Sequence, residues 1–243
     1  MKNVYCIIAV VLLLQGCEKD DFCNCTKSEG SMVSETRTLP AFEFIDMDNN
    51  VDIELTPDTI TYAVLTCGKN LADGIETEVS GNTLFVRNKN RCNWLRDFDN
   101  KFTLNVHFNK LSHIGNYGSG NLTCTDTLRM DNLVVESWNG MGTLSFIFNG
   151  GDLYLKIHTG AADMEASGMA NLLYIYTAGN GYMRTRNLEA NTVWLTTNST
   201  GDCEVFPKNE LDVNIGYNGD VFYHGSPVVI RKSVTGSGNL YPF

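Results

Sequence analysis

The sequence has few of the features that mark nucleic-acid-binding proteins or helical enzymes. Lysine and arginine together number 18 against 28 aspartate and glutamate residues, so the formal net charge is −10. A phosphate backbone needs a basic surface, and this balance therefore argues against a nucleic-acid partner. It also argues against electrostatic docking on anionic lipid. No segment carries apolar residues at the 3.6-residue spacing of an amphipathic helix. We therefore expect an all-β protein.

Long apolar runs are also scarce, and the one from Val4 to Leu14 is too short to cross a hydrocarbon core of about 30 Å as a helix. It has the length of the apolar region of a signal peptide. It ends in Leu14-Gln15-Gly16-Cys17, which resembles the lipobox of bacterial lipoproteins. We predict a signal peptide over residues 1–16 and a lipid, such as palmitate, on Cys17 that ties the protein to a membrane. The alternative is an ordinary secretory signal that happens to contain a cysteine.

The residues after Cys17 are polar and acidic, beginning Glu18-Lys19-Asp20-Asp21. We expect residues 17–35 to form a lipidated flexible tether. An acidic run so close to the lipid resembles the surface-export signal of outer-membrane lipoproteins in gut and oral anaerobes. This predicts an outer-membrane lipoprotein at the cell surface, with the periplasmic face as the alternative. Residues 36–243 are long enough for a single β domain with its own core.

The main positive signal is an internal repeat. From Leu111 onward a short alternating strand, a Gly/Asn/Ser-rich corner and a second short strand recur, with corners 18 to 22 residues apart. The corners are 118–120, 140–142, 160–162, 179–181, 199–201, 217–219 and 236–238. A period near 20 is shorter than that of propeller blades or helical repeats. It predicts a parallel β-helix of seven coils over 111–243, in which each coil buries the face of its neighbour. Glycine would supply the positive φ angles that sharp corners need.

The strands around each corner predict which residues point inward, because side chains alternate between the two faces of a strand. The first and third members of each triplet before a corner should be buried, as should the residue two positions after the corner. The triplets are 133–135, 153–155, 173–175, 193–195, 211–213 and 228–230, and the later residues are Leu122, Leu144, Met164, Met183, Cys203, Val221 and Leu240. Cys124 and Cys203 would then be buried about 19 Å apart, too far for a disulfide. We predict two free thiols.

Residues 36–110 also alternate like strands but less regularly. We interpret them as the start and cap of the same solenoid, with a separate small domain as the alternative. Cys67 and Cys92 both lie at the ends of strand-like runs in this part, and an exported protein favours disulfides. They are the best candidate pair.

Several features resemble a known family. They are the Gly-Ser-Gly corners at 118–120 and 236–238, the opening Phe42 to Leu55 with Val51-Asp52-Ile53, and the closing Tyr223-His224-Gly225-Ser226-Pro227. Together they are similar to the GIN-domain family, which is often labelled a putative auto-transporter adhesin head. The resemblance covers about residues 40–243. It implies a right-handed β-helical fold and an adhesin-like role, and it supplies no site residues.

Motifs for catalysis are missing. There is no Gly-x-Ser-x-Gly elbow, and the histidines His107, His113, His158 and His224 form no His-x-x-x-His pair that could start a zinc site. Asp163, Asp202 and Asp220 follow corners, where calcium binding is an alternative to their ordinary use in turns. Glu165, Arg184 and Glu204 should face outward on successive coils, where alternating charge supports stacking. We therefore expect no enzyme, no metal and no cofactor.

The outward middle members of the triplets are the best candidate site. They are Val134, Tyr154, Tyr174, Trp194, Asp212 and Val229, with Tyr176 beside them. Aromatic side chains in a flat row bind sugar rings or a protein partner, or they only stiffen the sheet. The sequence predicts a binding module that presents Tyr154, Tyr174, Tyr176 and Trp194 to a glycan or protein. The alternatives are a self-associating structural protein of the envelope and, more weakly, a β-helical enzyme acting on glycans.

Overall fold

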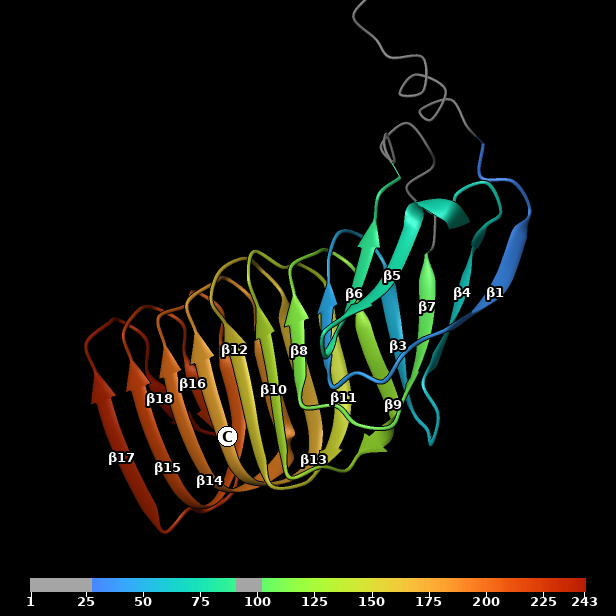
Figure 1. Ribbon diagram of the computed structural model, residues 1–243. Coiled ribbons are helices and arrows are strands. Elements are labelled where there is room, and N and C mark those ends of the chain that lie inside the picture. Colours follow the sequence, from blue (N-terminus) through green and yellow to red (C-terminus); the bar gives the residue numbers. More distant parts are fainter. Residues whose placement is uncertain (1–27, 91–101) are drawn as a thin grey trace, which may run out of the picture.

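The computed structural model describes residues 28–90 and 102–243 (Figure 1). The described chain is built from strands and one 3-10 turn, η1 (Ala72–Gly74). In chain order the strands are β1 (Met32–Thr38), β2 (Phe44–Met47), β3 (Asp52–Pro57), β4 (Tyr62–Gly68), β5 (Ile75–Ser80), β6 (Thr83–Asn88), β7 (Thr103–Phe108), β8 (His113–Asn116), β9 (Leu122–Leu128), β10 (Asn132–Ser137), β11 (Thr143–Asn149), β12 (Asp152–Ile157), β13 (Asp163–Thr177), β14 (Met183–Thr197), β15 (Cys203–Ile215), β16 (Val221–Tyr223), β17 (Val229–Val234) and β18 (Leu240–Pro242). In these residues no helix is long and apolar enough to span a bilayer.

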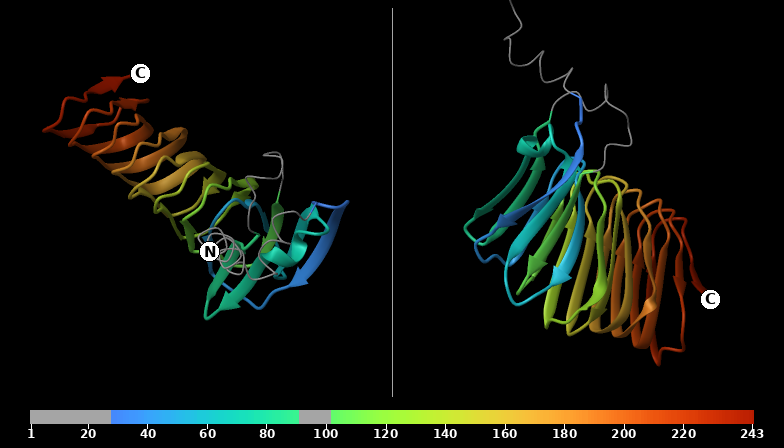
Figure 2. Two further views of the ribbon diagram at one scale, coloured as in Figure 1. Left: turned by 90° about the horizontal axis from the view of Figure 1, so that it is seen from above. Right: turned by 90° about the vertical axis from the view of Figure 1, so that its right-hand side faces the viewer.

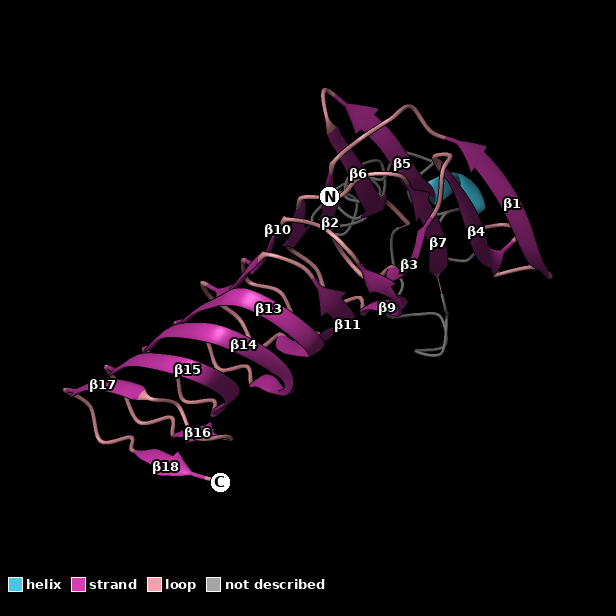
Figure 3. Ribbon diagram, turned by 90° about the horizontal axis from the view of Figure 1, so that it is seen from below, coloured by secondary structure: helices cyan, strands magenta, loops and turns pink. Residues whose placement is uncertain are grey.

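The strands form a right-handed parallel β-solenoid, as the sequence predicts (Figure 1). Its front sheet in Figure 1 contains β6, β2, β8, β10 and β12, then the second halves of β13, β14 and β15, and finally β17. The back sheet contains β7, β3, β9 and β11, then the first halves of β13 to β15, and finally β16 and β18. Each of the strands β13, β14 and β15 runs across both sheets, which Figure 3 shows from below. The seven corners stack in register, so the chain makes about six turns between the first and the last.

The N-terminal third joins this solenoid in an order that differs from the order of the chain. β2 pairs with both β6 and β8, and β3 pairs with both β7 and β9. The coil formed by β2 and β3 therefore lies between the later coils β6–β7 and β8–β9. The strands β1, β4 and β5 add antiparallel pairs at this end (Figure 2). One continuous core extends from Leu39 to Val221, and β1 begins at Met32, inside the segment 17–35 that the sequence assigns to a flexible tether.

The predicted inward ladders are present except in the last triplet, where Val228 and Ile230 are 85% and 43% exposed because no further coil covers this end. Residues Leu122, Leu144, Met164, Met183, Cys203, Val221 and Leu240 pair with one another across successive strands of the back sheet. One triplet is wrong by two residues, because Leu211 lies opposite Ile230 and Asp212 lies opposite Arg231. The predicted outward residue Val229 pairs with Glu210 instead. Cys124 and Cys203 are buried and free, as expected.

The corner glycines serve mainly to let neighbouring coils approach closely. Gly142 and Gly160 have positive φ angles of 84° and 92°, as predicted for sharp corners. Gly181 and Gly201 do not, yet a Cβ atom on either would come closer than 3.0 Å to the backbone of the preceding coil. The corner 199–201 begins with Ser199 where other corners have glycine. The Ser199 hydroxyl donates a hydrogen bond to the carbonyl of Gly179 in the preceding coil, at 2.6 Å. The corners are thus defined by contact between coils as much as by backbone conformation.

Candidate ligand-binding face

The predicted aromatic row lies on the outer surface of the front sheet. Tyr154 in β12 is opposite Tyr174 in β13, and Tyr174 is opposite Trp194 in β14. The rings of Tyr154 and Tyr174 have centroids 5.8 Å apart, and Trp194 is 47% exposed. The register extends this line of outward residues toward the N-terminal coils, and beyond Trp194 it continues to Asp212. We call its part from β2 to β14 the first aromatic row; the members are Phe44, His113, Val134, Tyr154, Tyr174 and Trp194.

A second aromatic row lies at the ends of the same strands and was not predicted from the sequence. Tyr117, Trp138 and His158 follow β8, β10 and β12 directly, and backbone hydrogen bonds between successive coils align them. Trp138 stacks on His158 with centroids 3.7 Å apart. His158 also contacts Tyr176, at 5.7 Å between centroids. Tyr117, Trp138 and His158 are about one coil apart in the sequence. The repeat would therefore have identified the second aromatic row if the predicted register had been continued beyond the end of each triplet.

Between the two aromatic rows runs a polar row, formed by Asp46, Gly115, Glu136, Lys156, Tyr176 and Thr196. The carboxylate of Glu136 contacts the Nε2 atoms of His113 and His158, at 2.9 and 3.1 Å. Burial would raise the pKa of Glu136, but these two hydrogen bonds hold it below its ordinary value. Burial raises the pKa of Asp46, for which no side-chain hydrogen bond is found among the described residues.

The side chains of Asp46 and Tyr117 cover Gly115 in the polar row. A Cβ atom at Gly115 would come within 2.6 Å of Oδ1 of Asp46 and 2.8 Å of the ring of Tyr117, and the glycine itself is buried. Beside it lies an open cavity of about 410 Å³, the Asp46 hollow, which Phe44, Asp46, His113 and Tyr117 help to line. Phe44 and Tyr117 are 37% and 42% exposed. A carboxylate and several aromatic edges therefore meet at this hollow.

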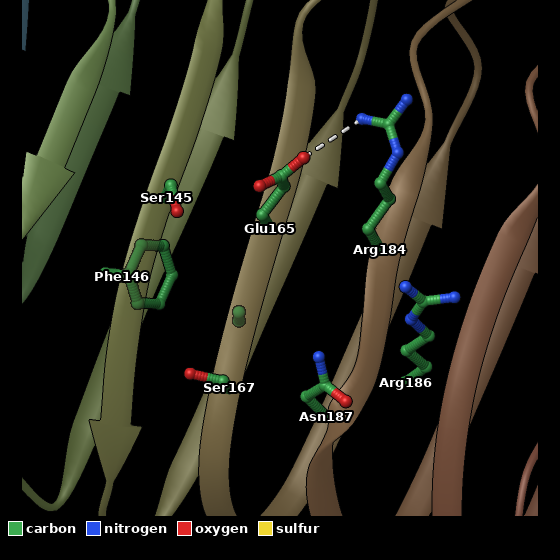
Figure 4. Close-up of a pocket in the computed structure, with 8 residues that line it drawn as sticks. Ser145, Phe146, Glu165, Ser167, Arg184, Arg186 and Asn187 are labelled. Carbon is green, nitrogen blue, oxygen red and sulfur yellow. Dashed lines mark hydrogen bonds and ion pairs between the residues drawn. The ribbon is translucent and has the colours of Figure 1, made fainter.

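The back sheet carries a second, smaller depression of about 260 Å³ over β11, β13 and β14 (Figure 4). Arg184 on its wall is already paired with Asp163 at 2.6 Å and with Glu165 at 3.2 Å. Arg186 lies 3.6 Å from Glu204, so the expected alternation of charge between coils is present. The registers of β13 and β14 shift here, and consequently Arg186 and its neighbour Asn187 both face solvent. The charged side chains around this depression therefore stabilise the stacking of coils.

The aspartates after the corners are also occupied. Asp163 accepts a hydrogen bond from the backbone N–H of Tyr182, Asp202 from that of Asp220, and Asp220 from that of Asn239, each at 2.8 Å. Each carboxylate thus caps the next coil, in keeping with the use of aspartate in turns. Across residues 28–90 and 102–243 there is no cluster of three His, Cys, Asp or Glu side chains suited to a metal ion.

Two predicted sites fall outside the described residues. Cys17, the predicted lipid attachment site, and Cys92 both lie in segments that the structure does not describe. Cys67 is buried near the end of β4, and burial raises the pKa of its thiol. The Cys67–Cys92 disulfide stays a prediction.

Solved structures of bacterial proteins share this fold. A putative adhesin from Bacteroides fragilis aligns with a TM-score of 0.81 at 22% identity, over 88% of this chain and 97% of that one. A putative lipid binding protein from Parabacteroides distasonis aligns at 0.67 and 19% identity, over 89% and 98%. A putative adhesin from Parabacteroides merdae aligns at 0.65 and 18%, over 90% and 98%. No curated protein matches the chain.

The family model with the description "Putative auto-transporter adhesin, head GIN domain" matches residues 41–227. This range begins just before β2 and ends just before β17, so it contains the reordered N-terminal coils and most of the repeats. The chain belongs to this GIN-domain family.

Proposed function

We propose that this protein is a lipid-anchored, surface-exposed binding module of the outer membrane whose front sheet attaches to a glycan or a protein. The observation that carries the proposal is the first aromatic row. Tyr154, Tyr174 and Trp194 lie on the outer surface of three successive coils, with Tyr176 beside them. Flat aromatic surfaces of this kind mark binding sites, because their rings bury a large area and lose little side-chain entropy on binding.

The adhesin-like family supports a role at the cell surface. The lipobox-like segment ending at Cys17 supports attachment through a lipid. The proposed role is binding without catalysis, since the carboxylates nearest the aromatic rows are engaged by histidines or stand alone over a shallow hollow. Protease treatment of intact cells tests the location, and a chain protected from protease would contradict surface display.

The binding role is tested by replacing Tyr154, Tyr174 and Trp194 with serine. These side chains project outward from strands whose inward neighbours are fully buried, so the triple variant should keep its fold by circular dichroism. We expect it to lose attachment to host mucin or cell extracts. Tyr241→Ser serves as a control, because Tyr241 is 42% exposed and belongs to β18 of the back sheet. Unchanged attachment of the triple variant would contradict the proposal.

Self-association of an envelope protein is the second candidate, and exposed apolar residues at the C-terminal coil favour it. Val228 and Phe243 are 85% and 74% exposed. However, β17 presents Arg231 and Lys232 on this outermost strand, and charged residues on an edge strand hinder pairing with a second copy. Concentration-dependent size in analytical ultracentrifugation would support self-association, and a constant monomeric size would exclude it.

A further inference from the structure

Resting on the proposed function, we propose that the ligand of the front sheet is a neutral glycan chain that lies along the solenoid axis. It would run over the polar row, between the two aromatic rows. The Asp46 hollow would take one sugar residue near one end of the chain. The site thus contains the second aromatic row, Tyr117, Trp138 and His158, in addition to the residues that the sequence predicts.

The arrangement of polar and apolar groups favours a sugar over a protein. A pyranose ring has an apolar face of C–H groups and a rim of hydroxyls, so it fits a strip in which aromatic rings alternate with hydrogen-bonding side chains. Here Trp138 and Tyr174 lie on either side of Glu136 and Lys156. The centre of a protein interface is instead depleted of charged residues, because burying them costs solvation energy. A glycan leaves such charges hydrated or bonded to its hydroxyls.

The strip gives an acidic glycan no net attraction. Asp46 and Glu136 are set against Lys156 in the polar row and against Arg87 near Asp46, and the chain as a whole has a formal net charge of −10. A uronic acid or sulfate group would bring a further negative charge toward these carboxylates. The carboxylate of Asp46 has no side-chain partner among the described residues and borders the hollow, so it would accept hydrogen bonds from sugar hydroxyls.

The length of the strip requires a chain of several sugars. It extends from β2 across β8, β10, β12 and β13 to β14, which is roughly 24 Å at about 4.8 Å between adjacent strands. Because the aromatic residues recur once per coil, each added sugar would meet a new ring. Affinity should therefore increase with the length of the oligosaccharide until the strip is covered.

Isothermal titration of the full chain with neutral oligosaccharides tests this proposal. The probes are gluco- and manno-oligosaccharides of two to six residues, a wider array of neutral glycans, and oligogalacturonates of the same lengths. We expect binding to at least one neutral series, affinity that increases with length, and weaker binding of the acidic series. Preference for oligogalacturonate, or no binding to any neutral glycan of the array, would overturn the proposal.

Variants separate this proposal from the more general one. Trp138→Ser should weaken neutral-glycan binding by about tenfold or more, the loss expected for one of a few anchoring side chains. Glu136→Gln, which keeps the shape of the side chain, should also weaken it, while Tyr241→Ser should not. The triple variant at Tyr154, Tyr174 and Trp194 could lose attachment while Trp138→Ser keeps it, and protease rather than periodate could destroy the natural ligand. In that case the front sheet binds a protein, and only the glycan proposal fails. If neither variant affects attachment, both proposals fail.

Discussion

Replacing a corner glycine should destabilise the solenoid because there is no room between coils, and Gly181 offers the clearest test. A Cβ atom at Gly181 would meet the carbonyl group of Ala162 in the preceding coil, with its carbonyl carbon 2.6 Å away. Overpacking of this kind costs about 1–3 kcal/mol. For a domain of this size the melting temperature would fall by about 2–12 °C. By contrast, a Cβ at Gly81 meets nothing within 4 Å, but Gly81 has a φ of +60°.

The two causes can be separated by asparagine, which tolerates the left-handed conformation better than alanine. At Gly81, Ala should cost about 1 kcal/mol and Asn should recover most of it. At Gly181, Asn should be at least as destabilising as Ala, since its side chain is larger. Urea unfolding of the four single variants measures these differences. If Gly181→Asn were more stable than Gly181→Ala, backbone conformation rather than contact between coils would explain the corner glycine, and our interpretation would be wrong.

Three further predictions follow from the core, the buried thiols and the polar row. Leu173→Ala should cost about 2–5 kcal/mol in urea unfolding because Leu173 is fully buried, whereas Trp194→Ser on the outer surface should cost about 1 kcal/mol or less. Burial raises the pKa of Cys203 to about 12 and that of Cys124 to about 11, so neither thiol should react with iodoacetamide at pH 8 until urea unfolds the protein; rapid labelling of the folded chain would contradict this. Because the pKa of Glu136 is lowered by folding, its contribution to stability is present above the ordinary glutamate pKa of about 4.3 and is lost as the pH falls through the lowered pKa of the folded state. Glu136→Gln should therefore lose less stability than the wild type over that range, and equal losses would refute the role of the two histidine contacts.

The repeat predicted the interior of the solenoid well because two independent constraints agree there. Alternation specifies which side of a strand is buried, and the 20-residue period specifies which residues lie opposite each other. Both hold for Leu173 and its neighbours in the ladder. They conflict at Val228-Val229-Ile230, where the apolar triplet suggests an inward position at Val228, two residues before the one that the period of about 20 residues indicates. The backbone pairing places Ile230 opposite Leu211, and no pattern in the triplet itself distinguishes that register.

The order of the N-terminal coils could not be predicted for a different reason. Alternation in Phe42 to Leu55 shows that this segment forms strands with one buried face, but it says nothing about which strand lies beside them. The structure inserts β2 and β3 between two later coils. This insertion contributes Phe44 and Asp46 to the candidate site, so the Asp46 hollow combines residues about 70 positions apart in the chain. Such a site depends on pairing between distant strands, which a local repeat does not encode.

Side-chain contacts between successive coils occur on the outer surfaces of both sheets. On the back sheet, outward side chains such as Asp163, Arg184 and Glu165 link one coil to the next through ion pairs and backbone caps. These contacts, together with the backbone ladders and the buried core, already hold the coils together. On the front sheet Glu136 joins His113 and His158 in the same way, and Arg231 joins Asp212. Trp194 takes no part in such a contact among the described residues and is 47% exposed. Its ring is therefore the part of the first aromatic row that the proposed ligand would cover most directly.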